Sequence, residues 1–266
     1  MRHAAQAGIR RAPVCTGAPG SLPAFSLVEL LVVVVVAGVL AALALPTLAK
    51  SMHQARVLKS LSLHRQAVAV LRLYSDDHRE AFPYLQTPGD PHGPKRLPGF
   101  ELRDDVGYFT AAAVYWPNLL RGVHVEHGAA REWGLPDSED SNIADGYPPD
   151  TIRARLFLTN TASADPAFWI TDEQPEDLSL LRSTAQFQVV FPAEKGLLVD
   201  IRAGLYDPRR AHLAHPGFDA SVGWCDGSGR ILHWSPEDPT RAVERWFGAK
   251  WWQVMATRGG LGGRDF

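Results

Sequence analysis

Glu29 stands at the start of the longest apolar stretch in the sequence, because residues 30–49 carry no charged side chain. A carboxylate in an apolar helix is costly, by about 2.5–3.5 kcal/mol on insertion scales at the helix centre and by less near an end. Glu29 therefore requires a partner. A cut just before Phe25 creates a new α-amino group four residues away. In an assembly of such helices, the amine of one subunit can neutralise the glutamate of the next.

Side chains of the types that bind metals form a second group of candidates towards the C-terminus: Asp200, His212, His215, Asp219 and Asp226. Zinc sites use histidine and carboxylate ligands, so a metal centre is one hypothesis for this group. The two histidines, however, are three residues apart in an expected loop, whereas the His-Glu-x-x-His motif lies on a helix. A surface turn rich in His and Asp is the commoner arrangement. We therefore expect no metal site and no cofactor.

Motifs of several common enzyme classes are missing from the sequence. It contains no Gly-x-Ser-x-Gly nucleophile elbow, no Walker phosphate loop and no Rossmann glycine fingerprint. Cys225 is expected to be a small buried hydrophobic residue rather than a nucleophile. With 27 basic and 29 acidic residues the formal net charge is −2, which provides no basic field for nucleic acid. We expect neither catalysis nor a nucleic-acid partner.

The first 49 residues have the organisation of a membrane anchor. Residues 1–24 contain Arg2, Arg10 and Arg11 and no acidic side chain, which is typical of a segment retained on the cytoplasmic side. The uncharged residues 30–49 span roughly 30 Å as a helix, enough to cross a bilayer once. We expect everything after Lys50 to lie on the far side of the membrane.

Two other interpretations of this anchor compete. A secretory signal peptide would be removed after a small-residue site such as Ala42-Leu43-Ala44. A plain single-pass anchor would keep its leader. Glu29 argues against both, because neither supplies the carboxylate with a partner.

The segment AFSLVELLVVVVVAGVLAALALP resembles the prepilin-type cleavage and methylation segment of type IV pilins and type II secretion pseudopilins. The resemblance rests on the aromatic Phe25, on Glu29 as the fifth residue counted from it, and on Pro46 as the twenty-second. Ala24 stands where the family usually has Gly, and its small side chain suits a tight protease subsite. The resemblance implies that a prepilin peptidase cuts between Ala24 and Phe25 and methylates the new amine of Phe25, with Glu29 acting in assembly.

Helical periodicity continues beyond Pro46, which should kink the helix without ending it. Apolar residues recur at spacings of three and four, with Leu63 and Ala67 on one side and Val68 and Leu71 roughly opposite. The helix should end by residues 76–77, before a stretch rich in proline. The later pattern predicts a helix over residues 107–122 with a proline interruption, and strands at residues 187–191, 196–201, 220–225 and 230–234.

Asp226-Gly227 lies between the last two of these strands and predicts a hairpin turn. The C-terminal part resembles planctomycete-type prepilin-like proteins that carry a His, nine residues and then Asp-Gly. Here ten residues separate His215 from Asp226. Residues 241–258 combine Trp, Phe and basic side chains and predict an amphipathic helix.

The fold class expected from these patterns is α+β, with a long N-terminal helix packed on a C-terminal antiparallel sheet, which is a pilin-like arrangement. The expected segments are a cytoplasmic leader 1–24, a transmembrane helix 25–49, an amphipathic stem helix 50–77, a globular head 78–240, an aromatic helix 241–258 and a disordered tail 259–266.

The resemblance implies a membrane-anchored structural subunit that joins a short filament of a type II secretion-like or type IV pilus-like system. Its partners would be the prepilin peptidase, other pilin or pseudopilin subunits through the N-terminal helix, and an inner-membrane assembly platform. It would lie in the bacterial inner membrane as a single-pass protein, with the leader cytoplasmic and the head periplasmic. The alternative is a periplasmic enzyme or ligand-binding domain on an uncleaved anchor.

Overall fold

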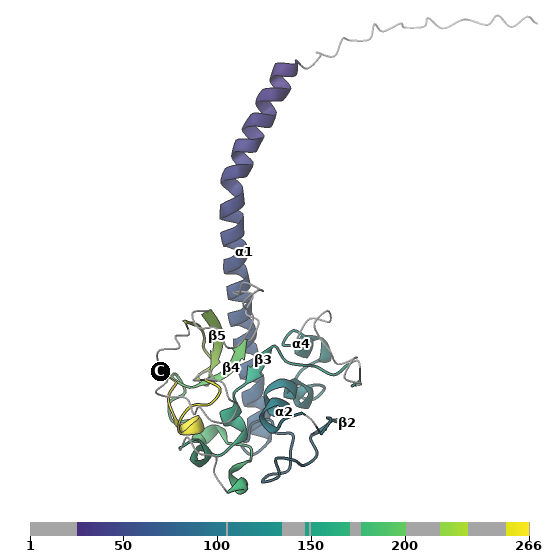
Figure 1. The fold of residues 1–266 in the computed structure, drawn as a ribbon, viewed down its shortest axis with the longest axis vertical. Helices are drawn as coiled ribbons and strands as arrows, with labels where there is room; N and C mark the ends of the chain where they lie inside the picture. Colours follow the sequence, from purple (N-terminus) through teal and green to yellow (C-terminus); the bar gives the residue numbers. More distant parts are fainter. Residues whose placement is uncertain are drawn as a thin grey trace, which may run out of the picture. The chain divides into compact units, whose positions relative to one another are not determined.

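The computed structural model describes residues 26–104, 106–134, 147–148, 150–170, 177–200, 219–233 and 254–265 (Figure 1). The chain divides into two compact units, residues 1–49 and 50–266, and each is described by itself. Predictions for residues 1–25 and 241–253 lie outside the described residues.

A single helix, α1 (Leu27–Asp77), contains residues 27–49 of the first unit and the stem of the second. It ends at the residue predicted from the sequence. Pro46 lies inside it without ending it, although proline cannot donate the usual backbone hydrogen bond. Part of the helix is long and apolar enough to cross a membrane, with a mean hydropathy of 2.9 over its most apolar window.

The stem of α1 buries one face against the rest of the second unit. Its buried residues recur at helical spacings of three and four: Ser60, Leu63, His64, Ala67, Val68, Leu71 and Ser75. Leu63, Ala67, Val68 and Leu71 thus share one face, and the prediction of two opposed apolar faces was wrong. The reason is geometric, because these positions fall within about 140° of arc at 100° per residue.

A four-stranded antiparallel sheet lies against this stem. Its strands are β3 (Leu156–Leu158), β4 (Gly196–Asp200), β5 (Asp219–Trp224) and β6 (Gly229–His233), in the spatial order β3-β4-β5-β6. Together with α1 they confirm the α+β class. Glycine at position 223 permits the close approach, because a Cβ there would lie 3.0 Å from Nδ1 of His64 and 3.2 Å from Cγ2 of Val68.

The hairpin between β5 and β6 forms as predicted. Gly227 has φ +88°, a backbone conformation that glycine adopts readily. The amide of Ser228 donates to the Asp226 carboxylate at 2.8 Å. The strand predicted at residues 187–191 is wrong, because residues Gln186–Gln188 form a 3₁₀ turn (η4) and Phe187 is 76% exposed.

Short helices fill the other side of the core. The predicted helix with a proline interruption is confirmed as α2 (Tyr108–Tyr115) followed by α3 (Pro117–Leu120). Asn118 ties this pair to the chain before β3: its amide nitrogen donates to the carbonyl of Ile152 at 2.7 Å, and its amide oxygen accepts from the Ile152 amide at 2.9 Å.

The remaining described elements are short. They are β1 (Arg96–Leu97), β2 (Phe100–Glu101), α4 (His127–Arg131), η1 (Asn160–Ser163), η2 (Pro166–Trp169), η3 (Leu178–Leu180) and η6 (Gly260–Gly262).

The C-terminal stretch is packed rather than disordered, so the prediction of a disordered tail at residues 259–266 was wrong for its described part. Leu261 and Asp265 are fully buried, and residues 260–262 form a 3₁₀ turn. The glycines that suggested disorder instead provide tight turns, with φ +80° at Gly259 and +59° at Gly260. Residues 254–258, at the end of the predicted aromatic helix, form turns and a bridge instead of helix.

Candidate functional site

Glu29 lies in the first turn of α1 and is held by the residue that precedes the helix. Its Oε2 accepts hydrogen bonds from the backbone amide and the hydroxyl of Ser26, each at 2.9 Å. The Ser26 hydroxyl in turn accepts from the Glu29 amide at 3.2 Å. This reciprocal pair is a capping box, whose signature Ser-x-x-Glu could have been read from the sequence. Ala24 and Phe25 lie outside the described residues.

The capping box satisfies hydrogen bonds but leaves the charge of Glu29 without an opposite charge among the described residues of the first unit. The surface that follows is apolar and exposed. Leu30, Val33, Leu40 and Leu43 are 57–67% exposed. Such a surface is compatible with a membrane-spanning helix.

A buried polar network joins the stem to the sheet. The Ser60 hydroxyl donates to Oδ2 of Asp200 at 2.8 Å and lies 2.7 Å from the Ser221 hydroxyl, and Nε2 of His64 lies 3.1 Å from that same hydroxyl. Arg155, the residue just before β3, forms an ion pair with Asp200. This network was not predicted from the sequence, although Ser60 and His64 lie four residues apart on the buried helix face.

Burial determines the electrostatics of this network. Desolvation lowers the pKa of His64 to about 4, opposed by the negative charge of Asp200 and reinforced by the positive charge of Arg155. The network contains the residue types of a catalytic triad, but Ser60, His64, Asp200 and Ser221 are each no more than 1% exposed. With no access for a substrate, the arrangement fixes the stem to the sheet.

The candidate metal ligands named from the sequence are not brought together in the described structure. Asp200 belongs to the network above, and Asp226 caps the hairpin turn, where hydrogen bonds from Ser228 contribute to lowering its pKa against an opposing desolvation. Asp219 lies in β5, and His212 and His215 lie outside the described residues. Among the residues that the structure describes, no group of three or more His, Cys, Asp or Glu is placed to hold a metal ion.

Cys225 is buried, as expected from the sequence. It lines a cavity of about 250 Å³ with Arg72, Phe82 and Leu197, and its carbonyl accepts a hydrogen bond from Arg72. Burial raises the pKa of the Cys225 thiol to about 12. The thiolate that nucleophilic chemistry requires is therefore hardly populated at neutral pH.

Comparisons of the chain with protein-family models, with curated proteins and with solved structures find no match.

Proposed function

We propose that this protein is a membrane-anchored structural subunit of the pilin or pseudopilin type. Its N-terminal helix would hold the chain in the bacterial inner membrane and then join other subunits in a short filament. The observation that carries the proposal is the start of α1, where one carboxylate, Glu29, precedes an exposed and otherwise uncharged apolar surface over residues 30–49.

The apolar surface at residues 30–49 requires contact with lipid or with other apolar helices. Fully burying one Val or Leu side chain contributes about 1.5–3 kcal/mol, and the exposed half of α1 presents a succession of such side chains. A bilayer covers them in the single protein. Equivalent helices of neighbouring subunits can replace lipid when a filament forms, because the surface is apolar on all sides.

The second argument concerns the charge of Glu29. Ser26 gives the carboxylate two hydrogen bonds but no opposite charge, and a lone charge in hydrocarbon is strongly disfavoured. An α-amino group at Phe25 of an adjacent subunit would neutralise it. This pairing requires that the leader, residues 1–24, be removed by a prepilin peptidase; methylation of the amine would keep it chargeable.

The third argument is that the head is fixed to its stem. The network of Ser60, His64, Asp200 and Ser221 crosses the contact between α1 and the sheet. Leu63, Ala67 and Leu71 bury their side chains in the same contact. A head attached rigidly to its stem is what a structural subunit requires, and the proposal assigns no catalysis to it.

The deciding experiment is to purify the protein from its native membrane and determine its N-terminus by mass spectrometry. The proposal expects a chain that begins at methylated Phe25. An Ala24→Gly variant is the matched control and should be processed at least as completely, because it restores the residue that the family usually has. An intact Met1 start in both chains would refute processing and favour a domain on an uncleaved anchor.

A further inference from the structure

A lysine and an aspartate are buried against each other at the point where the C-terminal stretch meets β4. Nζ of Lys195 lies 3.1 Å from Oδ1 of Asp265, and both side chains are fully buried. The two residues are 70 positions apart in the sequence. Placing two full charges in such a site is expensive, because desolvation can exceed the attraction between them.

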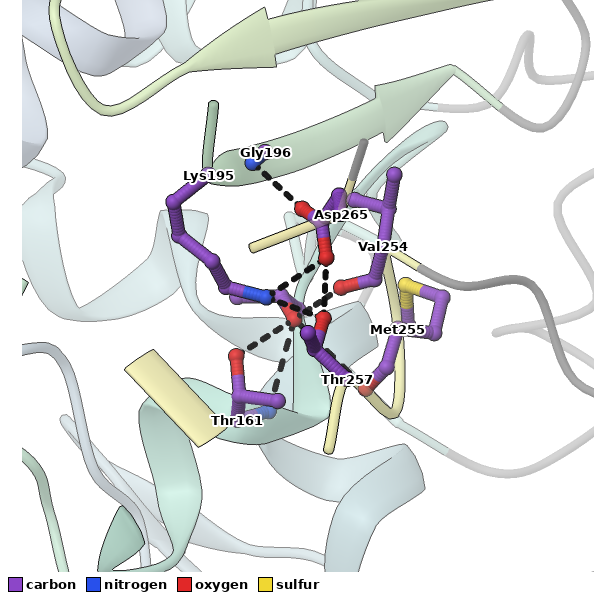
Figure 2. A network of polar contacts seen from close by, with 8 residues as sticks. Thr161, Lys195, Gly196, Val254, Met255, Thr257 and Asp265 are labelled. Carbon is purple, nitrogen blue, oxygen red and sulfur yellow. Dashed lines mark hydrogen bonds and ion pairs between the residues drawn. The ribbon is translucent and has the colours of Figure 1, made fainter. Parts of the chain in front are cut away.

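Two further groups complete the arrangement (Figure 2). The Thr257 hydroxyl accepts a hydrogen bond from Nζ of Lys195 and donates one to Oδ1 of Asp265. The backbone amide of Gly196 donates to the other carboxyl oxygen, Oδ2, at 2.6 Å. Each carboxyl oxygen therefore has its own donor, and the hydroxyl bridges the amine and one of the oxygens.

Burial disfavours the charged form of the Asp265 carboxyl. Desolvation raises the pKa of the Asp265 carboxyl even though Lys195 acts in the opposite direction. Val254 and Val222 crowd the backbone beside it, since a Cβ on Gly196 would lie 2.6 Å and 2.9 Å from their methyl groups. A proton passed from Nζ of Lys195 to the nearby Oδ1 would remove both charges and leave an amine beside a carboxylic acid.

We propose that Lys195 and Asp265 are joined by an intramolecular isopeptide bond between Nζ and the side-chain carbonyl carbon. The Nζ lone pair attacks Cγ of Asp265, and the electrons of the C=O bond move to Oδ2, which the Gly196 amide stabilises. The Thr257 hydroxyl takes one proton from Nζ and gives its own to Oδ1, which already carries the proton received from the ammonium. The Oδ2 electrons then re-form the C=O bond as the C–Oδ1 bond breaks and water leaves. Threonine is regenerated, and no oxidant or cofactor is needed.

Fixed geometry accelerates this condensation. Groups held in contact react as if at effective concentrations of about 10⁵–10⁸ M, and a buried site offers little water for the reverse hydrolysis. The product closes a covalent loop that ties the C-terminal stretch to the first residue before β4. This inference is independent of the proposed function and concerns the head alone.

The test is peptide mass spectrometry of the purified full chain after trypsin digestion. A bonded Lys195 resists trypsin, so the proposal expects residues 183–202 as one peptide, joined to the peptide that begins at Asp265 and lighter than the sum of the two by about 18 Da, one water. A chain cut normally after Lys195, yielding separate linear peptides, would overturn the proposal and leave a simple ion pair.

Two variants sharpen the result. Asp265→Asn should give the identical branched peptide by losing ammonia instead of water, which no non-covalent ion pair would do. Lys195→Arg keeps the charge but removes the reactive amine, and should give only linear peptides. If Lys195→Arg does not fold, the wild-type and Asp265→Asn digests still decide: linear peptides from both contradict the bond.

Discussion

Acidification provides a quantitative test of the buried network between stem and sheet, through the side chain of His64. Its folded-state pKa of about 4 lies below the ordinary 6.5 because the ring is fully buried. Nδ1 has no hydrogen-bond partner among the described residues, so a proton added there would be desolvated and unpaired. A difference of about 2.5 in pKa, at 1.36 kcal/mol for each unit, corresponds to about 3 kcal/mol.

The sign of the effect follows from proton binding. Between pH 6.5 and 4 the unfolded chain binds a proton at His64 and the folded chain does not, so stability falls as the pH falls. The contribution of His64 is fully present above pH 6.5 and is lost as the pH approaches 4. Carboxyl groups with lowered pKa values, such as Asp226, act at lower pH.

The assay is urea unfolding of the full chain in detergent, compared with a His64→Gln variant from pH 7 to pH 4. Glutamine can reach the Ser221 hydroxyl but does not titrate, and all other groups cancel in the difference. We expect the stability advantage of the wild type to shrink by about 3 kcal/mol over this range. Parallel stability curves for the two chains would refute the reasoning. If the variant does not fold, an NMR titration of the His64 ring should show no transition above pH 5.

Three further predictions concern other parts of the chain. Glu29→Gln keeps an acceptor for Ser26 but removes the charge, and should reduce cross-linked oligomers in membranes by about tenfold or more, equivalent to about 1.4 kcal/mol. The control Ser26→Ala keeps the charge and should leave the amount of cross-linked oligomer nearly unchanged. Equal losses in both variants would show that only the cap matters. Asn118→Ala leaves the buried amide of Ile152 without its partner and should lower the free energy of unfolding by about 3 kcal/mol, measured in urea. Cys225 should resist maleimide at pH 8 in the folded chain and react in urea, with labelling measured by mass spectrometry of the peptide that contains Cys225. Rapid labelling of the folded chain would contradict its burial.

Local patterns in the sequence were sufficient for the elements that depend on neighbouring residues. Periodicity predicted α1, because a helix is built from contacts three and four residues apart, and the proline-rich stretch after residues 76–77 predicted its end. Asp226-Gly227 defined the hairpin, since only the turn residues decide its backbone conformation. The proline break between α2 and α3 follows from the same local chemistry.

Other features depended on residues distant in the sequence, and only the tertiary structure decided them. The exposed 3₁₀ turn at Phe187 replaced an expected strand because a strand requires a partner strand that no local pattern specifies. Asp200 could be assigned to the stem network only when Ser60 and Arg155 were placed beside it.

The same distinction separates the two ends of the chain. The sequence by itself predicted an N-terminal helix long and apolar enough to cross a membrane, because length and apolar character are properties of a single continuous segment. It could not determine that the glycine-rich C-terminus is packed, because Asp265 is buried against Lys195, which lies 70 residues earlier in the sequence. Pairing between such distant residues exists only after the chain has folded.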